Sequence, residues 1–172
     1  AEILKSSMSM GEKCAENALE LLDSKSIPSG KYDIIMDPAL TGTFIHEAFG
    51  HACEADAILA GESILADKIG ERVGDKSVNV YDDPNMEEEF GYSPFDSEAI
   101  LAKKTVLVEN GVLQNYLHSL DTASKMGVDP TGNGRAASSS AKPIVRMTNT
   151  YLDGGDSNLE EMIEEMKNGV LC

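Results

Sequence analysis

Two of the chain's three histidines lie in one short segment, His46-Glu47-Ala48-Phe49-Gly50-His51. In the shorter HExxH motif, histidines four residues apart share one helix face and bind one zinc ion. Five residues apart, they diverge by about 140° on a regular α-helix, so a shared metal requires a local distortion. A π-type turn supplies it, and Gly50 is a residue type that tolerates it. We therefore predict a π-type turn over 46–51, with His46 and His51 as metal ligands.

A zinc ion at this position would produce a hydrolytic site. Zinc lowers the pKa of a bound water molecule and polarises a peptide carbonyl. Glu47, beside His46, is positioned to take the proton from that water, so it is the candidate catalytic base. A catalytic zinc also needs a third protein ligand. Glu54, three residues after His51, is either that ligand or an outer carboxylate that fixes a histidine tautomer.

The spacing alone also fits an amphipathic helix whose two histidines bind nothing. The surroundings favour the metal, because a partly buried glutamate between two histidines needs a partner. The small or apolar neighbours are Phe44, Ile45, Ala48, Phe49, Ala52 and Ala55.

The motif helix should begin at Asp37, an N-cap followed by Pro38, and should continue to about Ala60, where Gly61 ends it. A strand over Tyr32–Met36 should lead into it. The other expected helices cover 2–25 and a C-terminal segment opened by the capping box Ser157-Asn158-Leu159-Glu160 and ended by Gly169. The other expected strands are 77–81, 105–108, 112–117 and 144–152, with a turn at 82–85 and a long loop at 128–143. This mixture, with a hairpin around Asn110-Gly111, predicts an α+β fold with an antiparallel or mixed sheet.

Length and charge narrow the function classes. The 172 residues suit one domain, or one domain with an extension, and the formal charge of −16 opposes direct binding to nucleic acid. Three dispersed cysteines without a CxxC pair indicate a reducing compartment, and no apolar run is long enough to span a membrane. We therefore expect a cytoplasmic protein. The missing initiator methionine and the abrupt end at Cys172 suggest a fragment of a longer chain.

Four other residues have chemistry to consider. Cys53 is expected to be a small core residue, and His118 a solvent-exposed histidine at the end of a strand. Asn133 and Arg135 lie in the long loop. They either form a turn with a surface salt bridge or line a cleft in which Arg135 meets a substrate carbonyl or carboxylate.

The chain resembles the TldD/PmbA family, also called modulators of DNA gyrase. The resemblance lies in the segments 46–56, 91–96, 104–111, 130–135 and 146–150, in family order. It implies a zinc-dependent peptidase acting on peptides or unfolded protein segments as a homodimer or as a heterodimer with a PmbA-like subunit. Since this chain carries HExxxH, it resembles the TldD-like type. The third zinc ligand of the family is a later cysteine, so the resemblance places it beyond Cys172.

The sequence is also compatible with other functions. The chain is alternatively a non-enzymatic interaction or structural subunit, with a non-catalytic metal or none. Direct action on gyrase or DNA is opposed by the −16 charge. On the leading interpretation, 1–172 is part of a metallopeptidase domain. In isolation we expect it to be metal-free or substoichiometric in zinc, and inactive.

Overall fold

The computed structural model describes residues 2–172, with side chains from Met10 onward. It divides into two compact units, and the boundary in the chain falls between Tyr32 and Asp33. The first unit contains the helix α1, Glu2–Leu22, which confirms the helix expected at this end. The second unit contains all the strands and the metal motif.

The main sheet of the second unit has the strand order β4-β3-β2-β7 and is antiparallel throughout. Its strands are β2 Val80–Asp82, β3 Thr105–Glu109, β4 Val112–Leu113 and β7 Thr150–Leu152. Asn110 and Gly111, both at positive φ, connect β3 to β4, which is the backbone that a two-residue hairpin requires. The predicted α+β class and hairpin are confirmed.

Two smaller sheets accompany it. Strands β5 (Gly134–Arg135) and β6 (Ile144–Val145) pair antiparallel, whereas β1 (Asp33–Ile35) and β8 (Gly169–Leu171) pair parallel. The predicted 128–143 loop is therefore interrupted by a strand, and the predicted 144–152 strand is two short strands.

The C-terminal helix α5, Leu159–Glu165, is shorter than predicted. Its capping box is formed by Asn158 and Glu161, one residue later than expected. Gly169 does not end it but begins β8. A side chain at Gly169 would meet the Met166 sulfur and the Asp33 carbonyl, so the close pairing with β1 requires glycine here.

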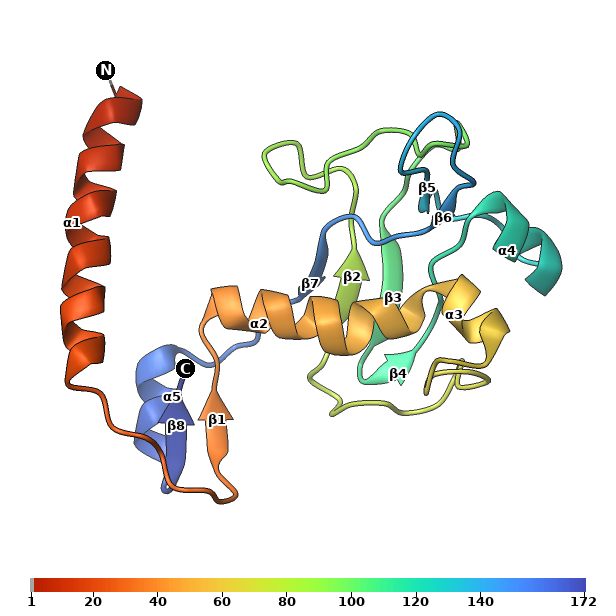
Figure 1. Ribbon diagram of the computed structural model, residues 1–172. Coiled ribbons are helices and arrows are strands. Elements are labelled where there is room, and N and C mark those ends of the chain that lie inside the picture. Colours follow the sequence, from red (N-terminus) through yellow and green to blue (C-terminus); the bar gives the residue numbers. More distant parts are fainter. Residues whose placement is uncertain (1) are drawn as a thin grey trace. The chain divides into compact units, whose positions relative to one another are not determined.

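The motif segment is not the single helix that the pattern predicts. It runs from α2, Pro38–Phe44, through a π-helix, Ile45–Gly50, and a 3₁₀ turn, His51–Cys53, to α3, Ala55–Ala60. Asp37 caps the N-terminus of α2 through its side chain, and Gly61 closes α3 in the left-handed conformation, as expected. The break lies at Glu54, whose backbone is extended (φ −71°, ψ 118°). Figure 1 shows this segment crossing the strands of the main sheet.

The break at Glu54 arises from a long-range contact. Leu117 forms a parallel bridge to Glu54, donating its N–H to the Cys53 carbonyl and accepting from the Ala55 N–H. This bridge explains why the predicted 112–117 strand is wrong beyond Leu113: the chain leaves the sheet to hold the motif segment. The helix α4, Leu120–Met126, which the sequence pattern did not suggest, follows it.

The core lies between the motif segment and the main sheet. It is built from aliphatic residues and a few larger side chains, as a chain without tryptophan requires. Its largest fully buried members are Leu107, Leu113, Leu117, Val80, Val108, Val145 and Cys53. Burial raises the pKa of the Cys53 thiol, and Asp82 and Glu54 nearby raise it further. Cys53 is a core residue, as predicted, and its raised pKa keeps the thiol protonated.

Candidate metal centre

The π-helix brings the two histidines of the motif together. The His51 N–H donates to the His46 carbonyl, the five-residue step that defines a π turn. The two imidazole rings lie edge to face with centroids 5.0 Å apart. One ligand-type atom from each of His46, Glu47 and His51 falls within 4.8 Å of the others. The predicted π-type turn, with both imidazoles on one side of the helix, is confirmed.

Glycine is needed at position 50 because the backbone lies against the core and leaves no room for a side chain. A Cβ atom at Gly50 would collide with the Met147 sulfur and approach the Ile45 carbonyl at 3.4 Å. Met147 is itself buried, so its side chain has little room to move.

Substitution of Gly50 tests this packing. We expect Gly50→Ala to lower the free energy of unfolding by about 1–3 kcal/mol, the usual cost of overpacking a core. Gly42→Ala on α2 is the matched control, because no atom lies within 4 Å of its added Cβ. The control should be neutral or stabilising by up to about 1 kcal/mol. Urea unfolding of both variants measures the difference. Equal stabilities would show that Met147 yields and that glycine is not required.

Glu54 lies behind His51. Its Oε1 is 3.2 Å from His51 Nδ1, and its Oε2 accepts a 3.0 Å hydrogen bond from Arg146 Nη1. The carboxylate is almost fully buried, and Oε1 has no well-aligned hydrogen-bond partner among the described residues. Burial raises the pKa of Glu54, whereas His51 and Arg146 act to lower it. Glu54 thus contacts the nitrogen of His51 that faces away from Glu47.

The other nitrogen of His51 points into the motif site. His51 Nε2 is 3.9 Å from Glu47 Oε2, and the Glu47 side chain is 68% exposed. The two nitrogens therefore have separate partners: Nδ1 faces the buried Glu54, and Nε2 faces the open side with Glu47.

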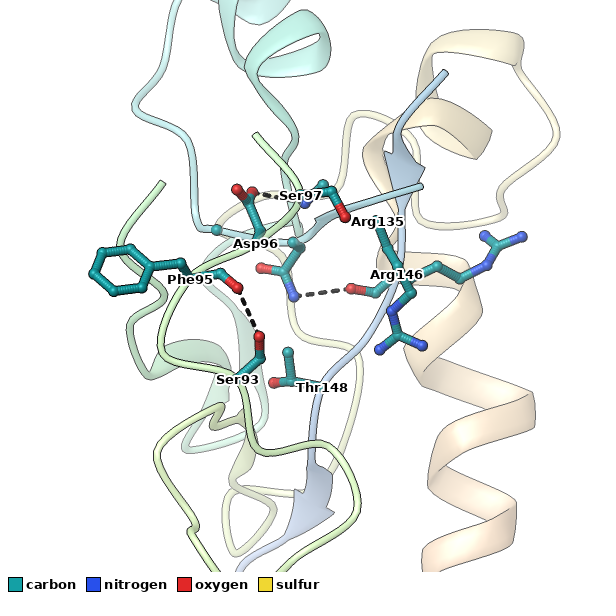
Figure 2. Close-up of a pocket in the computed structure, with 10 residues that line it drawn as sticks. Ser93, Phe95, Asp96, Ser97, Arg135, Arg146 and Thr148 are labelled. Atoms are coloured by element: carbon teal, nitrogen blue, oxygen red, sulfur yellow. Dashed lines mark hydrogen bonds between the residues drawn. The ribbon is translucent and has the colours of Figure 1, made fainter. Parts of the chain in front are cut away.

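A cavity of about 160 Å³ borders this site through Arg146. Two of the chain's three arginines, Arg135 and Arg146, line it, together with Ser93, Phe95, Asp96, Ser97, Gly132, Asn133, Gly134 and Thr148. Figure 2 shows the Arg146 side chain directed toward the motif helix, away from the other lining residues. No sequence pattern indicated that Arg146 pairs with Glu54, because the two residues are 92 positions apart.

Asn133 and Arg135 have different surroundings in this cavity. Asn133 is buried, and its amide is fully used: Nδ2 donates to Asp82 and to the Arg146 carbonyl, and Oδ1 accepts from Thr131. Arg135 is exposed and donates from Nη2 to the Met147 carbonyl at 2.9 Å. Of the two residues predicted to contact substrate, Arg135 therefore has donors to offer, whereas the amide of Asn133 holds the cavity wall together.

Asp82 lies under this wall at the end of β2. Its Oδ2 accepts from Asn133 Nδ2 (2.8 Å) and the Thr148 hydroxyl (2.8 Å). Its Oδ1 accepts from the Thr148 N–H (2.9 Å) and the Thr150 hydroxyl (2.7 Å). The predicted turn at 82–85 is therefore wrong at its first residue: Asp82 is buried and ends the strand β2, and the turn begins after it.

The prediction of a solvent-exposed His118 is also wrong. His118 is 5% exposed, its N–H is bonded to the Thr131 hydroxyl, and its Nδ1 lies 3.3 Å from the Thr122 hydroxyl. The chain does not continue as an exposed strand here but turns inward before α4.

The burial of His118 predicts a pH-dependent stability. Burial lowers the pKa of His118, so the folded protein favours the neutral ring. The unfolded chain takes up the proton first, as the pH falls below about 6.5, and stability is lost from there toward the folded-state pKa. We expect His118→Gln to be less stable overall but to lose less stability than wild type between about pH 7 and pH 5. Urea unfolding across that range measures both slopes, and parallel slopes would contradict the assignment.

The residues of the motif fit a metal ion. Two imidazoles and a carboxylate converge on one open side, and imidazole nitrogen suits zinc and other transition metals. Behind them, the unpaired Oε1 of Glu54 beside His51 Nδ1 matches the outer carboxylate that metal-binding histidines commonly have.

No helix in the described residues has the length and apolar composition needed to cross a membrane.

The comparison with known families places this chain in a family of metallopeptidases. Residues 29–172 match the family described as the PmbA/TldA metallopeptidase C-terminal domain. The chain belongs to this TldD/PmbA family.

Similar proteins support this assignment. A metalloprotease from Methanothermobacter thermautotrophicus is 50% identical over 94% of this chain and 35% of its own length. A solved structure of a candidate DNA gyrase modulator from Thermotoga maritima superposes with a TM-score of 0.83 at 36% identity, covering 95% of this chain and 36% of that one. The solved structure of TldE from Thermococcus kodakarensis superposes with a TM-score of 0.71 at 26% identity, covering 84% of this chain and 33% of that one. This chain spans about a third of the length of these relatives.

Proposed function

We propose that this chain carries the zinc-binding helix of a peptidase that hydrolyses peptides or unfolded protein segments. The observation that supports it best is the π-helix, which gathers His46, Glu47 and His51 on one side. His46 and His51 would hold the ion, and Glu54 would support His51 from behind rather than bind the metal. Zinc, when bound, would acidify a water molecule and polarise the peptide carbonyl.

Glu47 would act as the proton carrier. Its exposed carboxylate accepts a proton from the water whose oxygen adds to the carbonyl carbon. The same proton passes to the amine nitrogen as the C–N bond breaks, so Glu47 returns to its starting state. Arg135, at the neighbouring cavity, would donate to a substrate carbonyl or carboxylate.

The proposal includes a cytoplasmic location and a dimeric assembly, either a homodimer or a heterodimer with a PmbA-like subunit. The likeness to TldE supports the second arrangement, because a chain of the same fold could pair with this one. The −16 charge supports a peptide rather than nucleic acid as the substrate. The alternative, a non-enzymatic subunit with a structural metal or none, is weakened by the open side of the motif, since structural zinc sites are closed by four protein ligands.

Metal content tests this proposal. After dialysis against a weak chelator, the natural full-length protein should hold one zinc per chain by elemental analysis. His46→Ala and His51→Ala should each reduce zinc to a small fraction of that value, because the remaining ligands bind it weakly. His118→Ala is the control and should keep the metal, since the His118 ring contacts Thr122 and no residue of the motif. Full zinc content in the His46 and His51 variants would refute the assigned ligands.

A further inference from the structure

Arg146 and Glu54 form an ion pair directly behind the second histidine of the motif. The guanidinium donates to Glu54 Oε2 at 3.0 Å, while the other oxygen of the same carboxylate lies 3.2 Å from His51 Nδ1. The Glu54 side chain is 6% exposed. A carboxylate buried to this degree is stable as an ion only with a cation or several donors beside it. Arg146 Nη1 is the one cationic donor hydrogen-bonded to it in the described chain.

Both members of the pair are fixed by the backbone. Glu54 sits at the helix break, held on either side by the hydrogen bonds of Cys53 and Ala55 to Leu117. The backbone of Arg146 is paired with Asn133 in both directions: its N–H donates to the Asn133 carbonyl at 2.9 Å, and its carbonyl accepts from Asn133 Nδ2 at 3.0 Å.

Asn133 in turn donates to Asp82, so the pair is connected to the main sheet. The connection runs from Asp82 on β2 through Asn133 to Arg146, and from there to the motif helix. Backbones fixed in this way place the two side chains within hydrogen-bonding distance of each other without an ion present, as a pre-organised metal site requires.

We propose that Arg146 is a positioning residue for the metal centre: acting through Glu54, it holds His51 as the Nδ1–H tautomer, with Nε2 free for the metal. This inference rests on the proposed function for the identity of the metal ligand. Only a neutral ring with the proton on Nδ1 can donate to Glu54 and keep a lone pair on Nε2. Without Arg146, the Glu54 carboxylate would lose its cationic partner, and its interaction with His51 Nδ1 would weaken.

The position of Arg146 also joins the metal centre to the cavity. The same side chain lines the cavity of about 160 Å³ and binds Glu54. Arg135 lines the cavity too, but it donates to the Met147 carbonyl and makes no hydrogen bond to Glu54. Arg135 is therefore the matched control for Arg146, because it is the same residue type in the same cavity but makes no hydrogen bond to Glu54.

The tautomer of His51 in the metal-free protein tests the inference directly. Natural full-length protein labelled with ¹⁵N-histidine is studied by NMR at about pH 9, where histidine is neutral, and His51→Gln assigns the signal. Wild type and Arg135→Gln should show His51 with the proton on Nδ1. Arg146→Gln should shift His51 toward the Nε2–H form that an isolated imidazole prefers, and Arg146→Lys should restore part of the wild-type signal.

Two results would overturn the inference: wild-type His51 with its proton on Nε2, or an Arg146→Gln protein whose His51 is unchanged. The first needs no variant, so the test holds even if Arg146→Gln fails to fold.

Zinc affinity is the second measurement, by competition with a chelator. Arg146→Gln should weaken binding about 10–100-fold, the usual effect of removing an outer partner, and Arg135→Gln should leave it unchanged. Equal affinities for the two variants would contradict the inference. A wild-type protein that binds no zinc would refute the proposed function, while the tautomer measurement would still decide the role of Arg146.

Discussion

Glu47→Gln in the natural full-length protein should lose peptide hydrolysis by about 10²–10⁴-fold, the usual contribution of a general base, while zinc stays bound. The amide has nearly the shape of the carboxylate but cannot accept a proton from water. Because the Glu47 side chain is 68% exposed, its replacement should leave the fold intact. Hydrolysis of an unstructured peptide and zinc content, measured on the same preparation, separate chemistry from metal binding.

Glu62→Gln is the matched control, because Glu62 is an exposed glutamate just beyond α3 and outside the motif. It should keep full activity and full zinc content. If Glu47→Gln retains normal turnover at unchanged zinc content, Glu47 is not the base and the proposed proton path is wrong.

The largest effect on stability is expected at Asp82, where Asp82→Asn should lower the free energy of unfolding by about 3 kcal/mol, the cost of leaving buried donors unpaired. Each carboxylate oxygen of Asp82 accepts from one N–H and one hydroxyl. In the asparagine variant, the amide NH₂ would face one of these N–H donors in either orientation of the side chain, and two donors cannot form a hydrogen bond. The fixed donors are the Thr148 backbone and the Asn133 amide, and Asn133 is also committed to Arg146 and Thr131.

The adjacent residue provides the control for this prediction. The Asp83 carboxylate accepts hydrogen bonds from the N–H and the amide of Asn85 in the turn, so Asp83→Asn should change stability by less than about 0.5 kcal/mol. Urea unfolding of the two variants gives the comparison. An Asp82→Asn protein as stable as the Asp83→Asn protein would show that the network is not a structural centre.

Local sequence signals predicted the motif segment well. The five-residue spacing of His46 and His51 requires a π turn if one metal is shared, and Gly50 is the residue that the packing against Met147 demands. Asp37 and Gly61 mark the two ends of the segment because capping is decided within a few residues.

Long-range contacts account for what the sequence did not reveal. The helix break at Glu54 depends on Leu117, and the burial of His118 follows from the same change of direction. No local pattern links residues so far apart. Likewise, Asp82 reads locally as part of a turn, although its four donors come from segments about 50 to 70 residues later. Arg146 could not be assigned to Glu54 for the same reason.

An anomalous diffraction experiment at the zinc edge, on crystals of the natural full-length protein, tests the central claim most directly. We expect one peak at about 2.0–2.1 Å from a ring nitrogen of His46 and from Nε2 of His51, with Glu47 beside it and Glu54 on Nδ1. A peak elsewhere, or a straight helix with the two imidazoles on opposed faces, would contradict the claim that HExxxH forms a single metal site in this chain.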